Sequence, residues 1–267
     1  MQQALETWAN RSQISTGVRS PQMAQRLATR ETPDAAIVGQ QRWNHLLFAH
    51  WKIEPALVQA TLPPGLFVDS YEGAAYLGIV PFFMERIRPA WLPPLPWVSW
   101  FLELNVRTYV HDREGRPGVW FYSLDCNQPI AVAVARRFFH LPYFHARMNA
   151  TREGDLFTYQ SQRRGDAIEA QYVWRAIGET REAQPGSLEF FLVERYLLFT
   201  THRDGSLCSG RVHHQPYRLH AAELSACATH PAMLAGFELK GPPASVLCAP
   251  ALDVSVYALE KNATATG

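Results

Sequence analysis

Turn-forming residues recur about every 8–15 residues along this chain from residue 40 onward. The short runs between them are rich in β-branched and aromatic residues, which is typical of strands. Only a few segments have the features of short helices, chiefly Pro55–Leu62, Ile130–His140 and Ser187–Glu194. Because strands follow one another instead of alternating with helices, the sequence predicts an antiparallel barrel or sandwich with helices outside.

About a dozen strands are expected from these runs. They are Trp43–Trp51, Leu66–Asp69, Ala74–Phe83, Phe101–His111, Val119–Leu124, His145–Thr151, Leu156–Arg163, Ala167–Ile177, Tyr196–His202, Leu207–His213, Pro216–Ala222, Ala244–Cys248 and Val254–Leu259.

The expected organisation is one domain between two polar ends. Residues 1–38 are polar and poor in aromatic residues, which indicates an arm that is either mobile or a short surface helix. A transit peptide is disfavoured by the acidic residues Glu6, Glu31 and Asp34. Residues 39–261 are expected to form a single domain, and residues 262–267 a frayed tail.

Charge and composition exclude several classes of partner. The net charge is +1 and no block of like charge occurs, so a nucleic-acid partner is not expected. No run of about 18 apolar residues occurs, so we expect no membrane partner. The four cysteines lack metal-chelating spacing and are interpreted as buried thiols of a cytoplasmic protein. The aromatic-rich segments leave a homo-oligomer open.

The stretch FLELNVRTYV at Phe101–Val110 alternates strictly between apolar and polar side chains. Glu103, Asn105, Arg107 and Tyr109 fall on one face of the predicted strand. That face is either the wet outside of a sheet or the lining of a polar pocket. In a pocket, Arg107 is the natural clamp for a carboxylate, through two parallel hydrogen bonds.

Four further residues are candidates for a site. Asp125 ends the next strand and is either a turn residue, a general base or a partner for Arg107. His140 and Tyr143 lie in FHLPYFH, where His140 is either a proton shuttle or part of a packed aromatic corner. Trp120 is expected to form a wall of the pocket. The segment ERY at Glu194–Tyr196 is interpreted as a structural ion pair or helix cap.

No metal and no cofactor are expected. His213 and His214 are adjacent and point to opposite faces of a strand, and no dense ligand spacing occurs elsewhere. The chain also has no nucleotide phosphate loop and no GxSxG elbow, so nucleotide binding and serine hydrolysis find no support.

Several segments, taken in order, resemble one family of uncharacterised bacterial proteins. They are WNHLLFAHWKI (43–53), LPPGLFVDSYEGAAYLGIVPFFM (62–84), FLELNVRTYV (101–110), GRPGVWFYSLD (115–125), ARRFFHLPYFHARM (135–148), FLVERYLLFT (191–200) and VHHQPYRL (212–219). They look like the YqjF-like family, domain-of-unknown-function family 2071, grouped by fold with acetoacetate decarboxylase. The resemblance implies a closed or nearly closed, mostly antiparallel β-barrel-like core with a polar pocket inside.

The resemblance also implies Schiff-base chemistry, but this chain lacks the lysine that such chemistry needs. Acetoacetate decarboxylase uses a lysine that forms a Schiff base with a keto acid. The corresponding stretch here, GVWFYSLD, contains no lysine, and the chain has only Lys52, Lys240 and Lys261. Arginine stays protonated and is no substitute as an amine nucleophile. Schiff-base decarboxylation is therefore not expected.

Three hypotheses of function follow. The first is a lyase- or isomerase-like enzyme that binds a small anionic organic acid, with Arg107 as clamp and Glu103, Asp125 or His140 as acid and base. Asn105, Tyr109, Trp120 and Tyr143 would complete the binding site. The second is a module that binds such a molecule without catalysis. The third is an interaction protein whose segment PAWLPPLPWVSW docks a partner, unless that segment is a lid.

Overall fold

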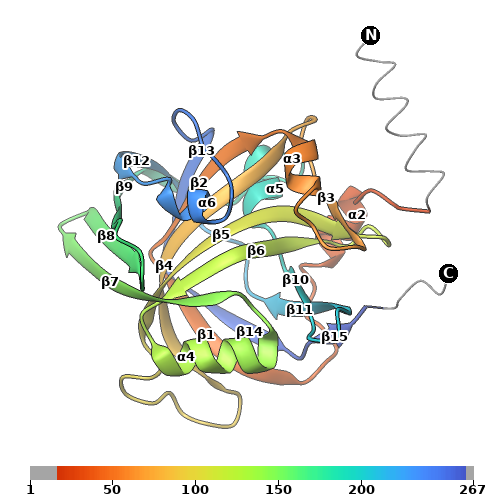
Figure 1. The fold of residues 1–267 in the computed structure, drawn as a ribbon, viewed down its shortest axis with the longest axis horizontal. Helices are drawn as coiled ribbons and strands as arrows, with labels where there is room; N and C mark the ends of the chain where they lie inside the picture. Colours follow the sequence, from red (N-terminus) through yellow and green to blue (C-terminus); the bar gives the residue numbers. More distant parts are fainter. Residues whose placement is uncertain (1–16, 263–267) are drawn as a thin grey trace.

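The structure is a computed structural model that describes residues 17–262. Its helices are α2 (Met23–Ala28), α3 (Pro55–Gln59), α4 (Pro129–Val134), α5 (Leu188–Val193) and α6 (His230–Leu234), and the π-helical turn η1 (Ala135–Phe139) continues α4. Its strands are β1 (Ile37–Asn44), β2 (Leu46–Ile53), β3 (Leu66–Val68), β4 (Ala75–Pro89), β5 (Phe101–Asp112), β6 (Pro117–Cys126), β7 (Tyr143–Glu153), β8 (Leu156–Arg163), β9 (Ala170–Arg181), β10 (Leu197–Thr201), β11 (Leu207–His213), β12 (Leu219–Cys227), β13 (Ser245–Ala249), β14 (Leu252–Tyr257) and β15 (Glu260–Lys261). Helices α2, α3, α4 and α6 lie around this sheet (Figure 1). The prediction that the helices lie outside is wrong for α5, whose residues Phe190 to Val193 are buried.

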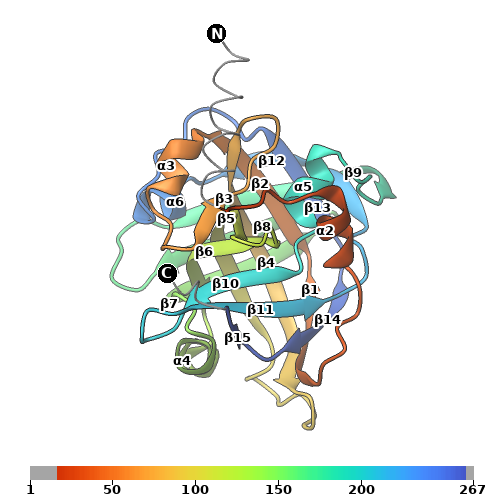
Figure 2. The ribbon, with the colours of Figure 1, turned by 90° about the vertical axis from the view of Figure 1, so that its right-hand side faces the viewer.

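The sheet closes on itself. Its hydrogen-bonded neighbours run from β1 through β14, β11, β10, β6, β7, β8, β9, β12, β13, β2 and β4, and β4 pairs again with β1, which makes a ring of 12 strands. β5 pairs with β4 on one side and β6 on the other, so it crosses the ring (Figures 1 and 2). The predicted mainly β architecture is confirmed. The sheet is mixed, however, because β6 pairs in parallel with both β7 and β10.

The three predicted helices are present: α3 and α5 are shorter than predicted, and α4 with η1 covers the segment predicted as Ile130–His140. The segment predicted as one strand over Trp43–Trp51 is two strands, because His45 has a positive φ of 48° and breaks it. Sequence reasoning did not single out α6. Of the predicted arm, residues 1–16 lie outside the described part, and the remainder contains α2 and the first residues of β1. The predicted tail beyond Asn262 also lies outside the described residues.

Helix α2 is attached to the domain by charged contacts. The two terminal guanidinium nitrogens of Arg26, Nη1 and Nη2, donate to Asp69 at 2.8 and 2.7 Å. Arg195, buried after α5, donates to the same carboxylate at 2.6 Å. Arg211 of β11 donates to the backbone carbonyl of Glu31 at 2.8 Å. The expectation of a structural ion pair in the ERY segment is confirmed by Arg195 and Asp69.

β5 has no wet face. Glu103, Asn105, Arg107 and Tyr109 are all buried on one side, and Leu104, Val106, Thr108 and Val110 are buried on the other. The two sides pack into different clusters: Tyr109 belongs to one, and Leu104 and Val106 to another. Because neighbouring strands cover β5 along both edges and the ring surrounds it, its polar side chains face the interior.

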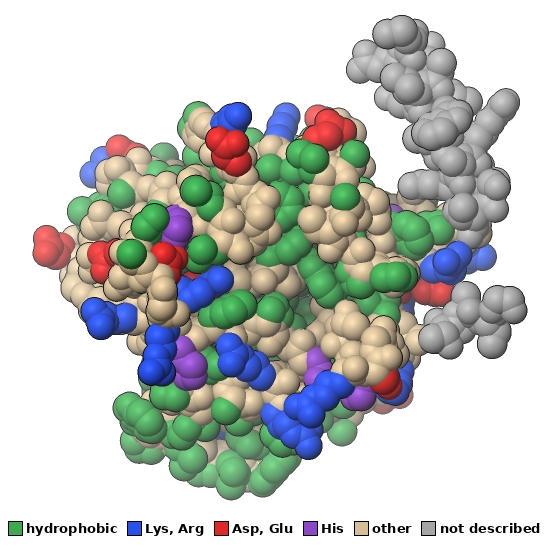
Figure 3. Space-filling view, viewed as in Figure 1, with side chains coloured by type: hydrophobic (Ala, Val, Ile, Leu, Met, Phe, Trp, Pro, Cys, Tyr) green, Lys and Arg blue, Asp and Glu red, His purple; other side chains and the backbone are tan. Residues whose placement is uncertain are grey.

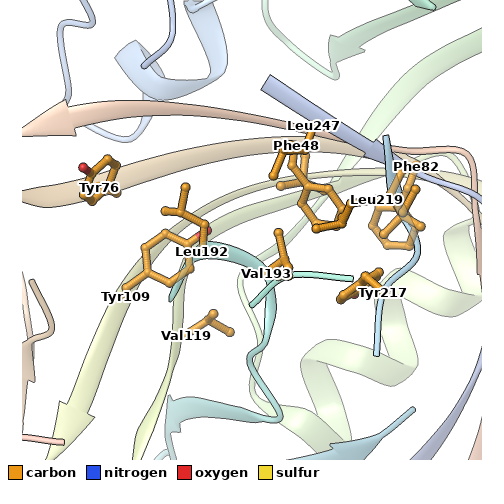
Figure 4. Close-up of a cluster of buried hydrophobic side chains, with 14 of the residues drawn as sticks. Phe48, Tyr76, Phe82, Tyr109, Val119, Leu192, Val193, Tyr217, Leu219 and Leu247 are labelled. Atoms are coloured by element: carbon orange, nitrogen blue, oxygen red, sulfur yellow. The ribbon is translucent and has the colours of Figure 1, made fainter. Parts of the chain in front are cut away.

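Helix α5 fills the interior beside the polar face of β5. Ser187 caps the helix by accepting a hydrogen bond from the amide of Phe190, as expected. Four successive apolar residues, Phe190 to Val193, are all buried, which is the pattern of a helix enclosed on every side. Figure 4 shows Leu192 and Val193 lying among Tyr109, Val119 and Tyr217.

The four cysteines are free thiols. Cys126, Cys208 and Cys248 are buried as expected, and Cys227 is partly exposed. Among the described residues, no helix has the length and apolar character needed to cross a membrane.

Candidate functional site

The candidate site is built where three strands align around a glycine. In the sheet, His50 of β2 pairs with Gly78 of β4, and Gly78 pairs with Arg107 of β5. A Cβ on Gly78 would lie 3.0 Å from the His50 ring and 3.4 Å from the Tyr109 hydroxyl. The missing side chain therefore lets His50, Arg107 and Tyr109 approach one another on one face of the sheet.

Arg107 is a buried cation without a carboxylate partner among the described residues. Arg107 is only 9% exposed. Its Nη2 donates a long hydrogen bond of 3.4 Å to the carbonyl of Leu192 at the end of α5. Its Nε has no hydrogen-bond partner. The guanidinium lies over the rings of Phe48 and Tyr109, 5.4 and 5.7 Å from their centroids. Ring contacts offset part of the desolvation cost but do not neutralise the charge.

Two imidazoles near this cation are held neutral. His50 Nε2 and the Tyr109 hydroxyl are 2.6 Å apart and share a hydrogen bond, while His50 Nδ1 has no partner. Burial and the nearby charge of Arg107 hold the pKa of His50 well below its usual value. Burial also lowers the pKa of His214 to about 4, and its Nε2 is likewise unpartnered. The surroundings of Arg107 therefore keep unused hydrogen-bonding atoms but add no negative charge.

Glu103 lies on the same face of β5, four residues and ~13 Å of strand from Arg107. The hydroxyl of Tyr143, from β7, donates to its carboxylate at 2.7 Å, and the hydroxyl of Tyr159 donates to its backbone carbonyl at 2.9 Å. Burial raises the pKa of Glu103 to about 7 although the Tyr143 hydrogen bond opposes the rise. Asn105, between the two, has an unpartnered side-chain oxygen.

The structure thus brings together five of the residues expected from sequence and leaves three elsewhere. Glu103, Asn105, Arg107, Tyr109 and Tyr143 lie on or against one face of β5. Asp125 pairs opposite Leu104, on the other face, and accepts a 2.8 Å hydrogen bond from Arg163 instead of Arg107. Of the alternatives for Asp125, a partnership with Arg107 is therefore wrong, because the register of β6 turns Asp125 away.

Trp120 and His140 also pack elsewhere than against Arg107. Trp120 pairs opposite Thr108 and packs with a separate cluster that contains Val110 and Phe199. His140 ends η1 with a positive φ of 53° and its ring meets His202 edge-on at 4.6 Å. Its packing against another ring agrees with the aromatic corner that the sequence left open.

Sequence reasoning missed His50, His214, Phe48 and Tyr217 as neighbours of Arg107. Alternation along β2 places Phe48 and His50 on one face, which was readable, but which strand they would face was not. Within residues 17–262, no three His, Cys, Asp or Glu side chains are grouped to hold a metal ion. All three lysines of the chain, Lys52, Lys240 and Lys261, are exposed, so no lysine amine lies in this interior.

A hollow of about 370 Å³ lies elsewhere, between the segment after α2 and strands β10, β11 and β14. Its two arginines are already engaged: Arg116 is 2.6 Å from Asp112, and Arg211 binds backbone carbonyls next to α2. This hollow is therefore a poorer candidate than Arg107 for binding an anion.

Comparison with known proteins gives one family and one fold. Residues 40–253 match the family DUF2071, described as an uncharacterized conserved protein. The chain is 41% identical over 192 residues to the uncharacterized protein YqjF of Bacillus subtilis (strain 168), covering 72% of this chain and 78% of that protein.

Solved structures of the same fold include three enzymes. Acetoacetate decarboxylase from Legionella pneumophila superposes with a TM-score of 0.61 at 15% identity, covering 87% of this chain and 90% of that chain. An acetoacetate decarboxylase-like enzyme from Sphingomonas wittichii RW1 gives 0.59 at 13%, covering 87% and 95%. The enduracididine biosynthesis enzyme MppR, complexed with pyruvate, gives 0.58 at 14%, covering 86% and 93%. The acetoacetate decarboxylase-like fold expected from the resemblance is thereby confirmed, whereas the polar pocket inside it stays a prediction.

Proposed function

Because this chain belongs to the DUF2071 family and has the acetoacetate decarboxylase-like fold, we propose that it binds a small organic carboxylate inside the ring of strands, with Arg107 as the anchor. The observation that carries the proposal is the buried guanidinium of Arg107, which has an unpartnered Nε and no described carboxylate beside it. A buried charge is costly unless an opposite charge meets it. A carboxylate ligand supplies that charge in the bidentate geometry that arginine prefers.

The neighbours of Arg107 define the rest of the ligand. Phe48 and Tyr109 offer apolar surface, and the unpartnered nitrogen of His50 offers one hydrogen bond to an uncharged polar group. A short keto or hydroxy acid has this combination of a carboxylate, a polar oxygen and a small carbon chain. One protein of the same fold is described as complexed with pyruvate, which is such an acid.

Acid–base catalysis is a second proposal, and Glu103 is the observation that favours it. Because Glu103 lies ~13 Å along β5 from Arg107, this proposal applies to an acid whose chain is long enough to reach from Arg107 to Glu103. A carboxyl group with a pKa of about 7 exchanges a proton readily near neutral pH. Its partner Tyr143 holds the carboxylate in place at 2.7 Å. The corresponding reaction is lyase- or isomerase-like and proceeds without a Schiff base, since every lysine is exposed.

The test compares the thermal unfolding of the wild type and of Arg107→Met with a panel of pyruvate, lactate, acetoacetate and acetate. For the wild type, an acid at about 100 times its Kd should add about 2.7 kcal/mol, a shift of several degrees. For Arg107→Met we expect no shift. Without ligand the variant should be about 1–2 kcal/mol more stable, because it lacks an unpaired buried charge.

Arg164→Met serves as the matched control, because Arg164 is exposed at a turn. It should keep the ligand-induced shift and change stability by less than about 0.5 kcal/mol. An acid-induced shift that persists in Arg107→Met would contradict the assignment of Arg107. Consumption of the stabilising acid, followed by NMR and lost in Glu103→Gln, would support catalysis; binding without consumption would support a non-catalytic module.

A further inference from the structure

Apart from the buried Arg107 site, the surface of the protein has an apolar region formed by two segments far apart in sequence. The loop of residues 90–100 between β4 and β5 lies at the same end of the molecule as α4 and η1, at the bottom of both ribbon views (Figures 1 and 2). The two segments are joined by a hydrogen bond of 2.9 Å from the side chain of Gln128 to the carbonyl of Trp97. They form one surface, here named the tryptophan end.

The tryptophan end exposes large apolar side chains. Trp91, Trp97 and Phe138 are 77%, 68% and 63% exposed, and Trp100 is 45% exposed. These four rings alone present roughly 500–600 Å², at the upper limit of the largest apolar patch on a typical monomer. The smaller exposed members are Leu92, Leu95, Ile130 and Val134. Figure 3 shows hydrophobic side chains gathered at the lower end of the molecule, where Figure 1 places this loop and α4.

The charge of the tryptophan end has one sign. Residues 90–100 and 127–142 contain Arg136 and Arg137 and no aspartate or glutamate. The adjoining end of β4 adds Arg86 and Arg88, and the carboxylate next to them, Glu85, is bound to Asn44 and Arg42. Within the described part of the chain, none of these four arginines forms an ion pair with a carboxylate; Arg88 bonds to the Gln40 amide and Arg136 to the Tyr143 carbonyl. Arg86, Arg136 and Arg137 are exposed.

We propose that the tryptophan end docks on the surface of an anionic lipid bilayer. Tryptophan and leucine side chains that stand clear of a fold insert at the boundary of headgroups and acyl chains, and arginine pairs with anionic headgroups. Each basic residue near such a surface contributes about 1 kcal/mol. A second copy of the chain is disfavoured as the occupant, because a two-fold contact would place arginines against arginines.

This peripheral contact differs from what the sequence excluded. The expectation of no membrane partner rested on the lack of a long apolar run, and a docking surface needs none. The backbone of the loop suits the role: Pro93, Pro94 and Pro96 keep it out of helix and sheet. Turn hydrogen bonds from the amides of Val98 and Ser99 to Pro96 and Leu95 fix its far end.

The test is co-sedimentation of the full chain with vesicles of phosphatidylcholine alone or with about 30% phosphatidylserine. We expect binding to the anionic vesicles only, with a blue shift of tryptophan fluorescence and weakening between about 0.1 M and 0.5 M salt. Trp91→Ser/Trp97→Ser and Arg136→Glu/Arg137→Glu should each weaken binding by more than about tenfold.

Matched controls lie near α3 and α6, at the other end of the molecule. Leu57→Ser/Met233→Ser removes two exposed apolar side chains, and Lys52→Glu/Lys240→Glu reverses two exposed charges. Both should bind vesicles like the wild type. Failure of the folded wild type to sediment with anionic vesicles would overturn the proposal. A solution dimer dissociated by Trp91→Ser/Trp97→Ser, without vesicle binding, would assign the surface to a second copy instead.

Discussion

Replacing Asp69 by alanine is expected to lower the free energy of unfolding by about 3–5 kcal/mol, measured by urea denaturation. Asp69 is buried and receives hydrogen bonds from Arg195 at 2.6 Å and from Arg26 at 2.8 and 2.7 Å. Burial alone would raise the pKa of Asp69, but the two guanidinium groups outweigh it and hold the pKa below its usual value. Removing the carboxylate leaves the fully buried Arg195 without a counter-charge.

A double variant distinguishes two causes of this loss of stability, the unpaired charge of Arg195 and the loss of packing around residue 69. Arg195→Met added to Asp69→Ala removes the unpaired charge and should recover part of the stability, whereas a simple cavity effect predicts a further loss. Asp253→Ala is the matched control, because that side chain is 78% exposed beside Arg42, and it should cost less than about 1 kcal/mol. An Asp69→Ala loss no greater than this control would contradict the account.

Replacing Glu103 by glutamine should remove a pH dependence of stability worth about 3 kcal/mol. The pKa of Glu103 in the folded protein, about 7, lies above the ordinary value of 4.5, so the folded state binds this proton more tightly than the unfolded state does. The stabilisation of the folded state by this proton is therefore fully present below pH 4.5. It is lost as the pH rises to about 7 and is absent at higher pH. Above pH 7 the glutamine variant should be the more stable protein.

The measurement is the difference in free energy of unfolding between the wild type and Glu103→Gln at several pH values from 4 to 9. A difference is needed because His50 and His214, whose pKa values are lowered by burial, change stability in the opposite direction over acidic pH. Glu238→Gln, at a side chain 77% exposed, should reproduce the wild-type profile. Parallel profiles for wild type and Glu103→Gln would show that the carboxyl group ionises normally in the fold.

Local pattern predicted the strands and much of the site's composition. The alternation of FLELNVRTYV placed Glu103, Asn105, Arg107 and Tyr109 on one face, and the structure keeps them there. The alternation could not tell that both faces of β5 are buried. That depends on pairing with β4 and β6 and on closure of the ring, which join segments far apart in sequence.

The errors about Asp125 and His50 also arise because their surroundings depend on pairing between strands far apart in sequence. The register between β5 and β6 decides which side chains of β6 lie on the same face as Arg107. This register includes an irregularity next to Arg107. The shift of one residue sends a side chain to the opposite face, so Asp125 meets Arg163. His50 was readable as a residue on a strand face, but its place beside Arg107 depends on the intervening Gly78 of another strand.

A crystal structure of the protein soaked with pyruvate would show whether Arg107 anchors the carboxylate. Both carboxylate oxygens should lie about 2.7–2.9 Å from the guanidinium nitrogens of Arg107, including the Nε that now has no partner. Pyruvate bound instead in the hollow beside α2, at Arg116 or Arg211, with Arg107 still held only by the Leu192 carbonyl, would contradict this role of Arg107.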